Sequence, residues 1–364
     1  MSDDIRALPA CRDPELRAVL SAVSPFCTAV DAAGLHRAAI VDRAAEAGLL
    51  ASLAHRLPAA WQRVEGLETA LKRVRQREAL KATLLHALCN QVLQLAAHHH
   101  IRAVVMKGAF TELVLHGGVG HRGFSDVDLL VDPDGARGMH AALLAAGFTR
   151  VGLPDRTASV EDAFEWTYLT PLPQRLLVDL HRAPCEPDYV RVDVNAWLRR
   201  AERVATDQGE RPGLCPEDLL LHLALHAASH AFELNLRTFL DGALLLHQRR
   251  VDLDAVVQQA RACGAAVPLW LLLNVLAELF CAPVPDAVMR AVAPGRIRQR
   301  YLRAHIPWRT GRLAVHGDNN RRRILTGIFP LLDGPGHAAR FVGTYLRRRV
   351  LDRMDAELER RSGR

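Results

Sequence analysis

The sequence has few of the features that mark several common classes of protein. Seven cysteines are scattered over 364 residues without a Cys-x-x-Cys pair, which argues against a zinc ribbon and a disulfide framework and favours a reducing cytoplasm. No apolar run approaches the roughly 20 residues of a membrane-spanning helix. The longest, residues 267–280, has 14 residues and contains Asn274 and Glu278. The first residues are acidic and interrupted by proline, so we expect no secretory signal.

Lysine and aromatic residues are also scarce. Only three of the 47 basic residues are lysines, and aromatic residues make up 5% of the chain, which leaves few side chains for stacking on nucleic-acid bases. The net charge of +7 is concentrated at the C-terminal end, where residues 296–364 contain 17 arginines and 6 acidic residues. Such a segment could attract nucleic acid, an anionic membrane surface or an acidic partner, but we favour a solvated helical face.

Hydrophobic residues make up 49% of the chain, and this content with this length predicts two or three globular domains. Residues 1–100 are predicted to be helical, because apolar residues between Leu67 and Leu95 recur every three or four positions. Residues 191–364 return to helical patterning and end in the basic segment. We therefore expect helical regions on both sides of a different central segment, residues 101–190.

The central segment has the pattern of a small α+β unit. Residues 103–106 and 127–131 are expected strands, and Asp132 is expected to cap a helix with Pro133 at its first position that runs to Gly147. Residues 165–170 and 175–181 flank a Pro-Leu-Pro turn and are predicted to form a hairpin.

Three carboxylates stand on these expected strands. Alternate side chains of a strand share a face, so Asp126 and Asp128 project together, and Asp179 is available in the strand-like run Leu-Val-Asp-Leu-His. Neighbouring carboxylates repel each other unless a cation lies between them, and oxygen ligands suit Mg²⁺. A pair of metals held by three acidic groups can activate an attacking oxygen and neutralise a leaving phosphate. The alternative for the Asp-x-Asp pair alone is an ordinary strand edge turning into solvent.

The string VVMKGAFTELVLHGGVGHRGFSDVDLLVD (residues 104–132), followed by LLVDLHR (residues 176–182), resembles the nucleotidyltransferase superfamily with a DNA polymerase β type palm. It is most similar to the branch of bacterial proteins described as uncharacterised nucleotidyltransferases, over roughly residues 101–250. The resemblance implies a small polymerase-β-like core with a mixed sheet. It also implies Asp126, Asp128 and Asp179 as catalytic metal ligands for Mg²⁺ or Mn²⁺, with Asp179 as the base toward the acceptor hydroxyl.

The same resemblance also indicates which residues would bind the nucleotide. Better-known members have Gly-Ser after the first strand, whereas this sequence has Lys107-Gly108, in which Gly108 permits close backbone approach and Lys107 supplies a positive charge. Arg122 could add a bidentate phosphate contact, and Ser125 precedes the acidic pair. The alternative for Lys107 and Arg122 is a salt bridge to neighbouring acids.

A histidine stripe follows in the next helical segment. His222, His226 and His230 are four residues apart and share one helix face, and His226 is expected to help hold the nucleotide or acceptor. A zinc site and a mixture of packed and solvated histidines are the alternatives. Arg237 and Asp241 are also four apart, which favours a simple pair between them, although the family has a similar stretch.

These observations predict a cytoplasmic nucleotidyltransferase. We expect it to transfer a nucleoside monophosphate, AMP from ATP or the equivalent from another nucleoside triphosphate, onto a hydroxyl or phosphate of a small molecule, peptide or protein, with release of pyrophosphate. Two alternatives remain: a non-catalytic, antitoxin-like binding module with the same fold, and a nucleic-acid-modifying enzyme.

Overall fold

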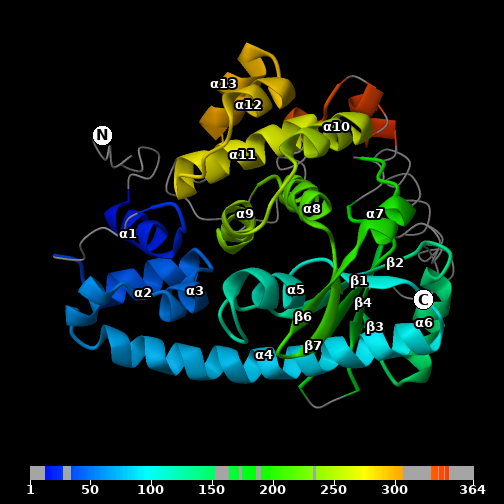
Figure 1. The fold of residues 1–364 in the computed structure, drawn as a ribbon, viewed down its shortest axis with the longest axis horizontal. Coiled ribbons are helices and arrows are strands. Elements are labelled where there is room, and N and C mark those ends of the chain that lie inside the picture. Colours follow the sequence, from blue (N-terminus) through cyan, green and yellow to red (C-terminus); the bar gives the residue numbers. More distant parts are fainter. Residues whose placement is uncertain are drawn as a thin grey trace, which may run out of the picture.

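The computed structural model describes residues 13–27, 34–151, 164–171, 174–185, 190–232, 235–305, 329–334, 336–339 and 341–343. The basic runs 321–323 and 347–349 therefore lie outside the described residues. Within the described ranges no helix is both long and apolar enough to cross a membrane. Helices surround a mixed sheet, which confirms the expected α+β class (Figure 1).

The sheet has seven strands in the order β3-β4-β5-β2-β1-β7-β6. The strands are β1 (Ala103–Val105), β2 (Asp126–Val131), β3 (Thr149–Val151), β4 (Glu165–Leu169), β5 (Leu177–His181), β6 (Glu202–Thr206) and β7 (Gly209–Gly213). The pairs β2–β5 and β1–β7 are parallel, and the remaining neighbours are antiparallel. The hairpin predicted on either side of the Pro-Leu-Pro turn is confirmed as β4–β5.

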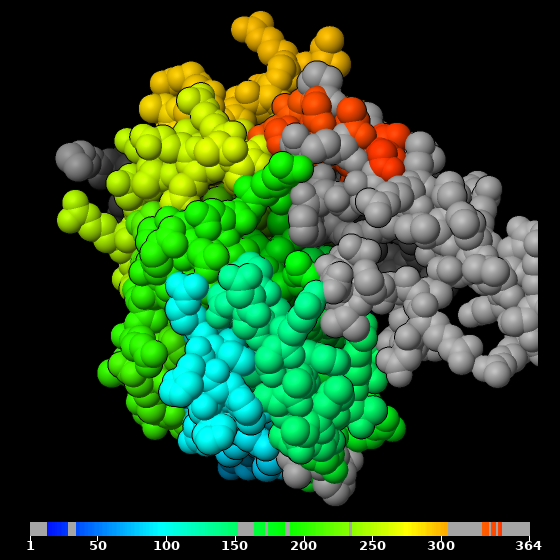
Figure 2. All heavy atoms as spheres, turned by 90° about the vertical axis from the view of Figure 1, so that its right-hand side faces the viewer, coloured from blue at the N-terminus to red at the C-terminus, as the bar shows by residue number. Residues whose placement is uncertain are grey.

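Helices lie on both sides of the sheet in Figure 1. The long helix α4 (Leu67–His98) runs along one side, contacts β1 and β2, and lies next to α6 (Ala136–Ala145) on the face seen in Figure 2. The other side carries α8 (Pro216–Ser229), α9 (Arg237–Gln248), α10 (Leu253–Cys263) and α11 (Ala266–Phe280). The remaining elements are α1 (Pro14–Val23), α2 (Arg37–Glu46), α3 (Leu50–His55), η1 (Ala59–Arg63), α5 (Ala109–Thr111), the π-helical turn η2 (Glu112–His116), α7 (Val194–Arg200), α12 (Asp286–Val292), α13 (Arg296–His305) and η5 (Phe329–Leu331).

One hydrophobic core joins these layers. Helix α4 buries the apolar stripe predicted from its three- and four-residue spacing, including Leu71, Leu85 and Val92. The 14-residue apolar run belongs to α11, which is buried on nearly all sides and so has the composition of a core helix. Strand β2 is apolar from Leu129 to Val131 because it lies in the middle of the sheet, with β1 and β5 on its two edges.

Two local expectations are wrong. Helix α6 begins at Ala136 rather than at Pro133: Asp132 Oδ1 accepts the expected type of hydrogen bond, from the Gly135 amide at 2.7 Å, but residues 133–135 form a turn that precedes the helix. The region after residue 190 is not entirely helical, since β6 and β7 form a hairpin and β7 adds to the sheet beside β1. Both strands are short and largely polar, so they lack the apolar alternation that would reveal them.

Candidate active site

Strand pairing brings the three predicted carboxylates together. Strands β2 and β5 run parallel with Asp128 directly opposite Asp179, and Asp126 lies on the same face of β2 two residues earlier. One carboxylate oxygen from each of Asp126, Asp128 and Asp179 lies within 4.8 Å of the others. The alternation seen in the sequence therefore places the acidic trio at one point of the sheet.

Asp128 has two cationic or protonatable neighbours. Its Oδ1 lies 3.0 Å from Lys107 Nζ and 3.2 Å from His181 Nε2, and the residue is only 2% exposed. Burial by itself would raise the pKa of Asp128, but the adjacent Lys107 and His181 hold that pKa well below its usual range. Asp128 is therefore ionised at neutral pH, with Lys107 as its counter-ion.

Asp179 has a different environment. Burial raises the pKa of its carboxyl to about 6, and the charges of Asp128 and Glu165 add to this effect. A carboxyl with a raised pKa in a pocket is suited to accepting a proton.

The acidic trio fits a divalent cation. Asp128 Oδ2 and Asp179 Oδ1 are buried, and neither has a hydrogen-bond partner among the described residues. Buried carboxylate oxygens normally have partners, and an oxygen-only set of ligands suits Mg²⁺ or Mn²⁺. These free oxygens are the observation that favours a metal at this point.

A pocket of about 440 Å³ opens over the trio. Its walls come from β2, β5, the loop before β2, and helices α8 and α9. All of the residues singled out from the sequence as metal or nucleotide ligands line it: Lys107, Gly108, Arg122, Ser125, Asp126, Asp128, Asp179 and His226.

The turn after β1 depends on its glycine. Gly108 has φ +52° and ψ −98°, a conformation that side-chain-bearing residues rarely adopt, and it begins the short helix α5. This turn directs Lys107 toward Asp128 on the adjacent strand. Lys107 thus makes the salt bridge that the sequence left as its alternative role.

His222 and His226 of α8 line the pocket together with His230, the C-cap residue of that helix. Burial lowers the pKa of His222 to about 3 and that of His226 well below the usual value, so both rings are neutral at neutral pH. Within the described part of the chain, the acidic trio is the only group of three or more potential ligands at metal-binding distance, which removes support from the histidine zinc site.

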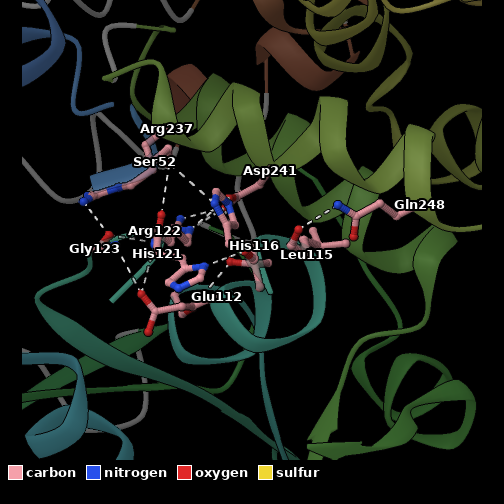
Figure 3. Close-up of polar contacts among 12 residues, drawn as sticks. Ser52, Glu112, Leu115, His116, His121, Arg122, Gly123, Arg237, Asp241 and Gln248 are labelled. Atoms are coloured by element: carbon pink, nitrogen blue, oxygen red, sulfur yellow. Dashed lines mark hydrogen bonds and ion pairs between the residues drawn. The ribbon is translucent and has the colours of Figure 1, made fainter. Parts of the chain in front are cut away.

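Arg122 is buried in an ion pair with Asp241 (Figure 3). Its Nε donates to Asp241 Oδ1 at 2.9 Å and its Nη2 donates to Oδ2 at 2.7 Å, while His116 Nε2 lies 2.8 Å from Oδ1. The pairing of Arg237 with Asp241 suggested by their spacing is therefore wrong. The loop before β2 brings Arg122 to Asp241 from a distant part of the chain, and Arg237 donates instead to the Gly123 carbonyl at 2.6 Å.

Glu112 accepts hydrogen bonds from the same loop. The sequence did not identify it as a residue of the site. Its Oε1 accepts from the backbone amides of Arg122 and Gly123 at 3.1 and 3.2 Å, and its Oε2 lies 3.0 Å from His86 Nε2. The signal in the sequence is a single acid within the largely apolar residues 109–115. An acid that is buried together with such neighbours needs hydrogen-bond or charged partners. Glu112 and Asp241 together fix the segment that leads into Asp126.

The fold and this acidic pocket define an α+β protein with three carboxylates that could hold a metal ion, and the comparisons with known proteins name the family. Residues 35–281, more than half of the chain, match the family described as uncharacterised nucleotidyltransferase, and the chain belongs to this family. Comparison with curated proteins gives no match. The chain is also similar to the crystal structure of an antigenic nucleotidyltransferase-like protein from Paracoccidioides brasiliensis, with 17% identity over 60% of this chain and 99% of that chain and a TM-score of 0.37.

Proposed function

We propose that the chain is a metal-dependent nucleotidyltransferase that transfers a nucleoside monophosphate to a hydroxyl or phosphate of an acceptor and releases pyrophosphate. ATP is the proposed donor, and the acceptor is a small molecule, a peptide or a protein side chain. The observation that supports this proposal is the pair of buried, unpartnered oxygens on Asp128 and Asp179, beside Asp126 and in an open pocket. The scattered cysteines support a cytoplasmic location for this reaction.

The proposed roles follow from the positions of the side chains. Asp126, Asp128 and Asp179 would hold Mg²⁺ or Mn²⁺, which when bound supplies positive charge toward the phosphates. Asp179 would also take the proton of the acceptor hydroxyl. His181 contacts Asp128 at 3.2 Å and Glu165 at 3.6 Å, so it orients a ligand rather than serving as one.

The test is transfer of label from each α-³²P nucleoside triphosphate, with Mg²⁺, to the protein itself or to components of a cell extract. We expect labelled product with ATP and a loss of about 10²–10⁴-fold in Asp179→Asn, because a general base is worth that much. Asp207→Asn, an exposed carboxylate in the β6–β7 turn, is the matched control and should keep full activity. Unchanged transfer by Asp179→Asn would remove this residue from the mechanism.

The non-catalytic binding module remains a second candidate because of the Lys107–Asp128 ion pair. An ammonium group 3.0 Å from a central carboxylate partly neutralises the trio without a metal. Nucleotide binding by the wild-type protein that is independent of Mg²⁺ and never leads to pyrophosphate release would favour this module over the enzyme.

A further inference from the structure

The pocket has three permanent cations among the described residues that line it, and two of them are already neutralised. Lys107 pairs with Asp128 at 3.0 Å, and Arg122 pairs with Asp241 at 2.7 Å. Arg237 is the exception, because in the described part of the chain its one hydrogen bond is to the neutral Gly123 carbonyl and it makes no ion pair. Figure 3 shows Arg237 reaching Gly123 from α9 while Arg122 contacts Asp241.

The Arg237 guanidinium is poorly compensated. Its Nε is buried without a hydrogen-bond partner among the described residues. Burial lowers the pKa of Arg237 to about 10, and the nearby Arg122 charge adds to this effect. The charges of Asp241, Asp126 and Glu78 act on this pKa in the opposite direction. With a pKa of about 10 the group is still charged at neutral pH. A partly buried guanidinium that makes no ion pair has lost some of its hydration free energy, and an anionic ligand would recover part of it.

The surroundings of Arg237 also suit an anion. It is the first residue of α9, whose N-terminus has no side-chain cap, so the positive end of the helix dipole adds to the guanidinium charge. Thr238, the next residue, lines the same pocket. His222 and His226 of α8 are neutral, so they add no second positive charge that would compete with Arg237 for an anion.

We propose that Arg237 binds the polyphosphate of the nucleotide, the role that the sequence suggested for Arg122. The proposal rests on the proposed function, because it requires that the pocket take a nucleoside triphosphate. A guanidinium can donate two parallel hydrogen bonds to phosphate oxygens, and Arg237 has no ion pair to break among the described residues before it does so. Arg122 could do so only by giving up its ion pair with the buried Asp241.

The test is calorimetric titration of the full-length protein, in Mg²⁺, with sodium tripolyphosphate, ATP and adenosine. Arg237→Gln should weaken tripolyphosphate and ATP by about 10- to 100-fold, as expected for a lost charge-assisted contact, and leave adenosine unchanged. Arg237→Lys keeps the charge and should recover part of the loss. The matched control is Arg203→Gln, which removes an exposed arginine of β6 and should bind all three ligands like wild type.

The outcomes separate this proposal from the proposed function. Equal weakening of ATP and adenosine by Arg237→Gln would overturn the proposal, because it would show a general disturbance of the pocket. Unchanged tripolyphosphate affinity in Arg237→Gln, or no tripolyphosphate binding by wild type, would also overturn it. Tripolyphosphate binding that depends on Arg237 in a protein without transfer activity would support the anion site and reject the enzyme, whereas ATP transfer with full ATP affinity in Arg237→Gln would do the reverse.

Discussion

At the residue scale, Asp241 links three separate segments of the chain. It pairs with Arg122 from the loop before β2, contacts His116 from η2, and accepts from Thr111 Oγ1 of α5 at 3.3 Å. Burial by itself would raise the pKa of Asp241, but Arg122 and His116 hold it well below its usual range. Asp241 on α9 thus acts with Glu112 in fixing the loop that leads into Asp126.

Asp241→Asn should be strongly destabilising. It removes the counter-ion of a fully buried guanidinium, a change that costs about 3–5 kcal/mol of unfolding free energy. The control is Glu210→Gln, which breaks the exposed pair with Arg203 and should cost less than about 1 kcal/mol. Denaturant unfolding of both variants measures the difference. Equal losses of unfolding free energy would show that the buried Arg122–Asp241 pair stabilises the fold no more than the exposed pair does.

The same pair has a definite pH dependence. Because the folded-state pKa of Asp241 is lowered, its stabilisation is present above the unfolded-state pKa of about 3.9 and is lost as the pH falls below it. The difference in unfolding free energy between wild type and Asp241→Asn should stay constant from pH 7 to about 5 and shrink below about 4. A difference that grows on acidification would contradict this assignment.

At the element scale, the unexpected strand β7 supports the strand that leads to the site. β7 pairs with β1 at Val105 and Gly213, and the Phe110 ring of α5 packs on Gly213 where a side chain would lie. Because Lys107 and Gly108 follow β1 with only Met106 between them and the strand, the β6–β7 hairpin stabilises one wall of the pocket from outside the central segment 101–190.

Gly213→Ala should therefore lower stability. Its new methyl group would overlap the Phe110 ring, and such overpacking costs about 1–3 kcal/mol of unfolding free energy. Gly295→Ala is the matched control, since a methyl group there meets open space, and it should change stability by less than about 0.5 kcal/mol. Thermal and denaturant unfolding report both changes, and a neutral Gly213→Ala would mean that Phe110 moves freely.

At the scale of the whole molecule, the pocket exists only where distant segments meet. Residues of the β1–β2 segment, the β4–β5 hairpin and helices α8 and α9 line it, so its ligand binds only to the folded chain. Such a ligand stabilises the folded state by mass action.

Addition of ATP with Mg²⁺ should increase the free energy of unfolding by about 2.7 kcal/mol at a hundredfold excess over Kd, and the Tm of the protein should rise accordingly. Asp126→Asn and Asp128→Asn should each lose the Mg²⁺-dependent part of the rise, because each removes an expected ligand. Asp207→Asn, at the exposed β6–β7 turn, should keep it. Thermal denaturation with ATP plus Mg²⁺ and with ATP plus chelator provides the comparison. The metal assignment is wrong if both site variants retain the full rise.

The α+β class, the β4–β5 hairpin and the acidic trio could all be predicted from the sequence, because each depends on short-range rules. Alternation along β2 puts Asp126 and Asp128 on one face, and the Leu-Val-Asp-Leu-His run supplies Asp179 on a neighbouring buried strand. The β6–β7 hairpin was not predicted, because it has a weak apolar pattern and depends on pairing with β1. Which charges are paired depends on long-range packing: Arg122 pairs with Asp241 from 119 positions away, whereas the spacing of Arg237 and Asp241 suggested a local pair. Local spacing determines which side chains share a face, but packing determines which charge lies opposite.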